Sequence, residues 1–171
     1  MEKQRSTNRG MVFGDDVTDI VDNTQAESIV NRLTKLLVYL DQNHPGEGWA
    51  SYIQGEKPDW TRIVVSGLSQ GAGMSAYIAQ REPVARVVLF SSPWDYSIEP
   101  RSLAPWIGEA SVTPPERWFA EYHRRADHVR VFDLDLPPDY HRGHSDNPYH
   151  GSTAHLPAYA PEWRYLFGSS P

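Results

Sequence analysis

The sequence feature that most limits the fold is a β-branched run that leads directly into a glycine-rich turn containing a serine. Residues 63–65 (Ile-Val-Val) favour a strand, because β-branched side chains pack well on a pleated sheet. Residues 67–71 (Gly-Leu-Ser-Gln-Gly) match the pattern Gly-x-Ser-x-Gly, and the small residues that follow favour a helix. We therefore predict a strand over Arg62–Ser66, a sharp turn at Ser69 and a helix over Gln70–Arg81.

A second strand is predicted directly after this helix. Pro83 disfavours the α conformation of the residue before it, so the helix should end there. The apolar run Ala85–Phe90 then predicts a strand. A strand, a helix and a strand in this order form a βαβ unit with a right-handed crossover. The sequence thus predicts an α/β fold in which helices flank a mostly parallel sheet.

Further elements are predicted on both sides of the βαβ unit. Thr24 and Glu27 match a capping box, and apolar residues at helical spacing predict a helix that ends by Asn43, before a His-Pro-Gly cluster. We divide the chain into an irregular N-terminal arm over residues 1–23 and one domain over residues 24–171. The remaining predicted elements are two strands, Arg117–Tyr122 and Val129–Leu136, and a short closing helix, Pro161–Leu166.

Composition excludes several classes of function. The chain has 171 residues and a formal net charge of -6, which disfavours nucleic acid and anionic membranes as partners. Its densest basic stretch, residues 123–125, is offset by Glu121 and Asp127. The chain has no cysteine, which excludes disulfides and Cys-ligated zinc. No apolar run approaches the roughly 20 residues of a membrane span, and the first residues lack the apolar core of a secretory signal. We expect a cytoplasmic location unless an upstream segment carries a signal.

Ser69 is the candidate nucleophile of this sequence. A sharp turn between a strand and a helix lifts the serine hydroxyl clear of the backbone and holds the residue in a strained conformation. The flanking glycines are expected to relieve crowding where the strand and the helix nearly touch. The amide of Gln70 lies at the helix N-terminus, where it can hold the oxyanion that develops during acyl transfer.

The chain resembles a group of poorly characterised bacterial proteins with the α/β-hydrolase fold. The resemblance runs from about Asn23 onward and is carried by RIVVSGLSQGAG, VARVVLFSSPWD, TPPERWFAEYH and APEWRYLF. It implies a serine hydrolase that acts on esters, with catalytic residues in the chain order serine, acid, histidine. We expect no cofactor. Leu68, Trp94 and Trp106 are candidates for the lining of the substrate pocket.

The resemblance implies that an acid completes the catalytic triad, and two aspartates are candidates. Asp127 follows the predicted strand Arg117–Tyr122, which is where the acid-bearing loop of this fold falls. Asp95 is the alternative, because it follows Ala85–Phe90, the next predicted strand after the Ser69 turn. A surface role for Asp127 and a turn-capping role for Asp95 stay open as alternatives.

The base of the triad must come later in the chain. His144 matches the C-terminal loop of the family best, and His150 is the alternative. His155 and His141 are further candidates in this region. These histidines, with Asp146, are also of the types that bind zinc, but their spacing matches no strong metal signature, so we expect no metal site.

The chain departs from the family at its N-terminal side. Several strands and helices precede the nucleophile in a complete α/β-hydrolase, and each βα unit needs about 30 residues. The residues before Ser69 offer one good helix, no convincing strand and no His-Gly motif for the second oxyanion donor. We therefore expect a partial α/β-hydrolase fold whose N-terminal half of the sheet is reduced or absent.

The chain is then either the C-terminal part of a longer hydrolase or a shortened member that forms a homo-oligomer over its exposed sheet edge. The alternative to an enzyme is a non-catalytic module that binds a partner or itself.

Overall fold

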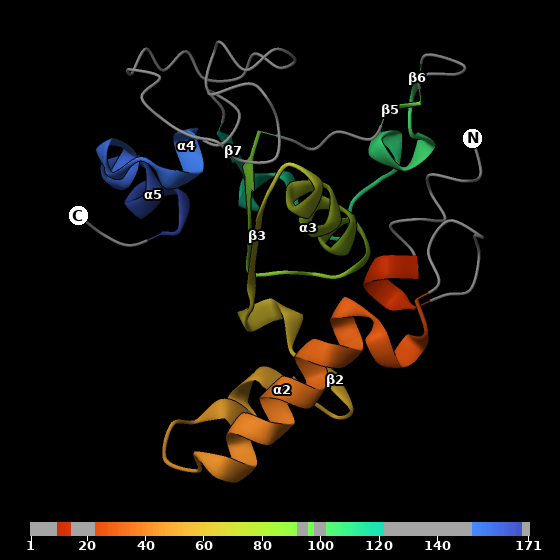
Figure 1. Cartoon of the computed structure of the whole chain (residues 1–171), viewed down its shortest axis with the longest axis vertical. Helices are drawn as coiled ribbons and strands as arrows, with labels where there is room; N and C mark the ends of the chain where they lie inside the picture. The colour runs from red at the N-terminus through yellow and green to blue at the C-terminus, as the bar shows by residue number, and fades with distance from the viewer. Residues whose placement is uncertain (1–9, 15–22, 92–95, 98–101, 122–151, 169–171) are drawn as a thin grey trace.

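The computed structural model describes residues 10–14, 23–91, 96–97, 102–121 and 152–168 of the chain. Its centre is a parallel sheet of three strands, in the spatial order β3 (Val64–Leu68), β4 (Arg86–Phe90) and β7 (Trp118–Glu121). Figure 1 shows this sheet between helices on both sides. The predicted α/β character and the parallel pairing of the strands are confirmed.

Two helical layers cover opposite faces of the sheet. Helix α3 (Gln70–Arg81) packs on one face, where the main core, the α3-side core, contains small, β-branched and aromatic side chains. Helices α4 (Ser152–His155) and α5 (Ala160–Leu166) lie on the other side of the sheet in Figure 1. The smaller core of this second face contains the buried residues Val88, Phe90 and Leu166.

The elements predicted around the serine turn are confirmed to within two residues. Helix α3 has the predicted bounds, and β4 starts one residue later than predicted. Strand β3 starts and ends two residues later, because its pairing with β4 continues to Leu68 opposite Phe90. Strand β7 and helix α5 match the predicted third strand and closing helix to within a residue at each end. The strand predicted over Val129–Leu136 lies outside the described residues.

Helix α2 (Ile29–Asn43) ends where the sequence predicts, but its beginning differs. The capping box of Thr24 and Glu27 forms around a 3-10 turn, η1 (Gln25–Glu27). The helix proper starts after Ser28, whose side chain accepts a hydrogen bond from the Asn31 amide. A second cap close after the first therefore sets the start of α2.

The segment between α2 and β3 contains a small hairpin. Its two short strands, β1 (Ile53–Gln54) and β2 (Lys57–Pro58), pair antiparallel across Gly55, which has a φ of 63°. The 3-10 turns η2 (Trp49–Tyr52) and η3 (Trp60–Arg62) flank the hairpin.

The segment between β4 and β7 is anchored to the end of α3 by one buried threonine. Thr113 is fully buried, donates a hydrogen bond to the Glu82 carbonyl at 2.7 Å and accepts one from the Val84 amide at 3.0 Å. The short elements of this segment are β5 (Tyr96–Ser97), β6 (Ser102–Leu103), η4 (Pro105–Gly108) and η5 (Pro115–Arg117). Near the N-terminus, residues 10–13 form a helical turn whose Val12 is fully buried in the α3-side core.

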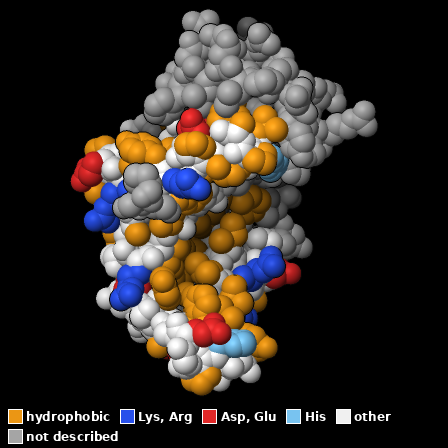
Figure 2. All heavy atoms as spheres, turned by 90° about the vertical axis from the view of Figure 1, so that its left-hand side faces the viewer, with side chains coloured by type: hydrophobic (Ala, Val, Ile, Leu, Met, Phe, Trp, Pro, Cys, Tyr) orange, Lys and Arg blue, Asp and Glu red, His pale blue; other side chains and the backbone are white. Residues whose placement is uncertain are grey.

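One edge of the sheet has no neighbour among the described strands. Of the described strands, only β4 pairs with β3, and Val64 at the start of β3 is 42% exposed. Figure 2 shows hydrophobic side chains around a hollow on the left-hand side of the molecule in Figure 1, where α5 lies. Tyr165 and Phe167, in and just after α5, add to the exposed apolar surface of the described residues.

None of the helices in the described ranges combines the length and apolar character that crossing a bilayer requires.

Candidate active site

The backbone of Ser69 adopts the strained conformation that the sequence predicts for a nucleophile. Its φ of 55° and ψ of -116° lie outside the regions that non-glycine residues ordinarily occupy. Such a conformation costs on the order of 1–3 kcal/mol and persists only when the surrounding structure enforces it. Ser69 is half-buried at the junction of β3 and α3, and its side chain does not cap the helix.

Hydrogen bonds on both sides hold Ser69 in this conformation. Its amide donates to the Phe90 carbonyl on β4 at 3.0 Å, so the serine continues the ladder of the sheet. Its carbonyl accepts from the amides of Ala72 and Gly73, so it also begins the helix. Ser69 is therefore hydrogen-bonded to both the sheet and the helix. The change of chain direction between them occurs at its own φ and ψ.

The close approach of the strand and the helix explains the first glycine of the motif. A Cβ atom on Gly67 would lie 2.2 Å from the Gly71 carbonyl carbon and 2.6 Å from the Ala72 nitrogen. These contacts are with backbone atoms, which cannot move without displacing α3. Gly67 is therefore required by the packing of β3 against the first turn of α3.

The second glycine has a different role from the one the sequence suggested. A Cβ atom on Gly71 would meet nothing within 4 Å. The lack of a side chain at this position therefore relieves no crowding. Gly71 instead supplies the backbone that Gly67 approaches. The expectation that both flanking glycines relieve crowding thus holds for Gly67 alone.

The helix N-terminus beside Ser69 can stabilise negative charge. Gln70 and Gly71 are the first residues of α3, and the first amides of a helix have no intrahelical acceptor. The helix dipole adds a partial positive charge at the same end. Gln70 itself is an exposed residue.

Leu68 and Trp106, the two described candidates for a substrate pocket, lie in different places. Leu68 is the last residue of β3 and packs against the smaller core that contains Phe90 and Leu166. Trp106 is 2% exposed and lines a pocket beside the second half of α3, together with Gln80. Gln80 is separated from the start of α3 by about 15 Å of helix, and the lining of the pocket does not include Ser69.

Most candidates for the acid and the base fall outside the described residues. These are Asp95, Asp127, His141, His144 and His150, together with Trp94. His155 is described and is exposed at the end of α4. Within the described ranges, no group of three or more metal-binding side chains comes together.

A buried carboxyl group that the sequence did not single out lies at the same edge of the sheet as Ser69. Glu121, whose charge in the sequence offsets the neighbouring basic stretch, ends β7 and is 2% exposed. Its carbonyl accepts a hydrogen bond from the amide of Ser91, the residue after Phe90 on β4. The carboxyl edge of the sheet thus carries Ser69 after β3, Ser91 after β4 and Glu121 at the end of β7.

The surroundings of the Glu121 side chain disfavour its charge. Neither carboxylate oxygen has a hydrogen-bond partner among the described residues. Burial, and to a smaller extent the nearby carboxylate of Glu162 on α5, raises the pKa of Glu121 to about 7. The side chain is therefore neutral in mildly acidic solution and charged in alkaline solution, where the charge is costly.

Comparison with protein-family models, with curated protein sequences and with solved structures gave no match.

The contacts of the two glycines predict opposite effects of the same substitution. Gly67→Ala should destabilise the protein by about 3 kcal/mol, because the new methyl group overlaps the backbone of α3. Gly71→Ala should stabilise it by about 0.5–1 kcal/mol, because alanine favours a helix and its Cβ has free space. Urea denaturation followed by circular dichroism measures both. Equal effects of the two substitutions would contradict the close approach of β3 and α3.

The raised pKa of Glu121 predicts that stability falls as the pH rises. Between pH 4.5, the ordinary value, and about 7 the folded state binds more protons than the unfolded state, so the free energy of unfolding declines across this window. The decline attributable to Glu121 should be about 3 kcal/mol in total. Glu121→Gln should remove it, as shown by urea denaturation at pH 4 and pH 8.

The exposed Glu116 on η5 provides a matched control for this measurement. Glu116→Gln should leave the pH dependence of the wild-type protein in place. If Glu121→Gln and Glu116→Gln have the same pH dependence, Glu121 is not the group responsible.

Proposed function

We propose that the protein is a serine hydrolase that acts on esters, with Ser69 as its nucleophile. The observation that carries the proposal is the backbone of Ser69, with φ 55° and ψ -116° between a parallel strand and a helix. Strain of this kind clusters at active sites, because it fixes a reactive side chain in one direction. An inert turn at the same junction has no need of a non-glycine residue in this region of φ and ψ.

The proposed reaction follows from the chemistry of an activated serine. The Oγ of Ser69 attacks the acyl carbonyl carbon of the ester while His144 takes the hydroxyl proton. Asp127 orients the imidazole and stabilises its positive charge. The proton then passes to the departing alcohol, and a water molecule releases the acid from the acyl-enzyme by the same steps. His150 and Asp95 are the alternatives for the base and the acid.

The helix N-terminus supports the part of the mechanism that stabilises charge. The amide of Gln70 is available to the oxyanion because it is the first of helix α3. A second donor is common in such sites, and loss of one donor costs about 10²–10³ in rate where it has been tested. A chain with one donor would therefore turn over slowly, although its serine would still react.

We further propose that the fold is the C-terminal part of an α/β-hydrolase. The sheet supports this, because its parallel strands run in chain order from β3 to β4 to β7 with the serine after β3. In this arrangement β3 would border the N-terminal strands of a complete fold. Among the described strands, that edge has no partner.

The same edge favours a second candidate function. None of the described strands pairs with the outer edge of β3, and Val64 at its start is 42% exposed. Free strand edges with apolar neighbours are sites where another strand can pair. A non-catalytic module that binds a partner or a second copy through β3 would use this edge and would not need a reactive Ser69.

A fluorophosphonate probe separates the two functions. The probe reacts covalently with activated serines, so the folded wild-type protein should be labelled and Ser69→Ala should abolish labelling. Ser66→Ala is the matched control, because Ser66 is an exposed serine on β3, the strand that leads into Ser69. Labelling is measured by intact mass and in-gel fluorescence, with circular dichroism to verify folding.

Two outcomes would contradict the enzymatic proposal. One is the absence of labelling in a folded wild-type protein, and the other is labelling that persists in Ser69→Ala. Single substitutions of His144 and His150 by alanine then identify the base. Labelling should be lost in His144→Ala and kept in His150→Ala, and the reverse result would assign the base to His150.

A further inference from the structure

A pocket of about 340 Å³ lies between the second half of α3 and the segment from η4 to the start of β7. Its walls are mainly apolar and include Ala76, Trp106, Ile107 and Trp118. This volume is at the lower end of the range for small-molecule sites, which favours a ligand of one or two rings. The pocket does not include Ser69, which lies at the other end of α3.

The aromatic walls of the pocket are held in place by their own contacts. Trp106 packs edge-to-face on Tyr77 of α3, with ring centroids 5.4 Å apart. The indole N–H of Trp118 donates to the Thr113 carbonyl at 3.0 Å, and Thr113 is itself anchored to the end of α3. Both indoles are thus fixed before any ligand binds, which favours recognition of a flat apolar molecule.

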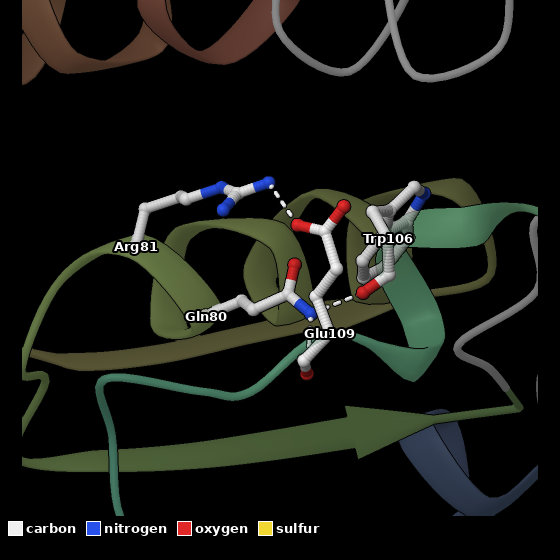
Figure 3. Close-up of polar contacts among 4 residues, drawn as sticks. All are labelled: Gln80, Arg81, Trp106 and Glu109. Carbon is white, nitrogen blue, oxygen red and sulfur yellow. Dashed lines mark hydrogen bonds and ion pairs between the residues drawn. The ribbon is translucent and has the colours of Figure 1, made fainter.

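Gln80 lines the pocket, and its side chain carries a hydrogen-bond acceptor that no described residue uses. The side chain is 4% exposed, and its Nε2 donates to the carbonyls of Trp106 and Glu109 (Figure 3). These two carbonyls can only accept, so they fix which end of the carboxamide is the nitrogen. The Oε1 atom points away from the Trp106 carbonyl and has no partner among the described residues. A buried acceptor without a donor costs about 1–3 kcal/mol.

A movable side chain lies on the side of the pocket where this acceptor points. Figure 3 shows the Gln80 oxygen directed toward the side on which Arg81 and Glu109 form their ion pair. The two charged groups are 2.8 Å apart, and their side chains are 34% and 29% exposed. An ion pair this exposed contributes little to stability, so the Glu109 side chain can move at small cost.

We propose that this pocket binds a small uncharged molecule with a flat apolar body and one N–H or O–H group. The apolar body lies against Trp106 and Trp118, and the donor bonds to Gln80 Oε1 after the Glu109 side chain moves aside. Only a donor satisfies the unused acceptor, so molecules of the same shape without one bind more weakly. The site is separate from Ser69, and it does not depend on the proposed hydrolase activity.

Indole and benzofuran test the proposal as a matched pair of probes. They have nearly the same shape, but only indole carries an N–H donor. Titration of the full chain, followed by ¹H–¹⁵N NMR at the Trp118 indole and the Gln80 carboxamide, should show saturable binding of indole. Benzofuran should bind about fivefold more weakly, which corresponds to the loss of one ordinary hydrogen bond.

Glu109→Ala tests whether the Glu109 side chain covers the acceptor. The Glu109 carbonyl that accepts from Gln80 stays in this variant, so the loop keeps its anchor. Binding of indole should tighten by a factor of two or more, whereas Glu116→Ala, a matched loss of an exposed charge outside the pocket lining, should leave it unchanged. The proposal is overturned if indole shows no saturable binding, or if indole and benzofuran bind equally. Equal binding of indole to Glu109→Ala and the wild type would also overturn it.

Discussion

The close approach of β3 to the first turn of α3 is the constraint on which the rest of the structure depends. At Gly67 the strand and the helix touch through backbone atoms, and a single methyl group there would overlap the helix. The chain must therefore reverse direction within one residue, and that residue is Ser69. The hydrogen bond from Ser69 to Phe90 joins this turn to β4, and the bond from Ser91 to Glu121 joins β4 to β7. These hydrogen bonds thus connect the carboxyl ends of the three strands, starting from the Ser69 turn.

Residues with positive φ and a buried carboxyl group lie together at this edge of the sheet. Ser69 and Ser91 are the non-glycine residues with positive φ in the described part of the chain, and each follows a strand of the sheet. Glu121 ends the third strand as a buried carboxyl group without a hydrogen-bond partner among the described residues. Strain and buried charge both lower stability, so their presence together favours a functional role for this edge. The opposite end of α3 instead holds the apolar pocket around Trp106, where Gln80 Oε1 has no hydrogen-bond partner among the described residues.

Local patterns were sufficient to predict the elements around Ser69. The β-branched strand, the glycine turn and the small-residue helix each follow from neighbouring residues, and α3 has the predicted bounds. Burial that depends on distant segments could not be predicted in this way. Glu121 stands beside basic residues in the sequence, and nothing in that stretch indicates that it is buried near Glu162 of α5, about 40 positions later in the chain. Trp106 was expected near a substrate, and its packing on Tyr77 places it beside the far half of α3. The acid and base assigned to Asp127 and His144 stay predictions from the sequence.

The central claim is that the strained turn makes Ser69 a nucleophile, and a trapped acyl-enzyme tests it most directly. The protein is mixed with p-nitrophenyl acetate, quenched in acid within the first turnover, digested and mapped by mass spectrometry. A nucleophilic Ser69 predicts one acetyl group on the peptide that contains Ser69, formed in step with the release of p-nitrophenol. An acetyl group on another residue, or release of p-nitrophenol with no acetyl group on Ser69, would contradict the claim.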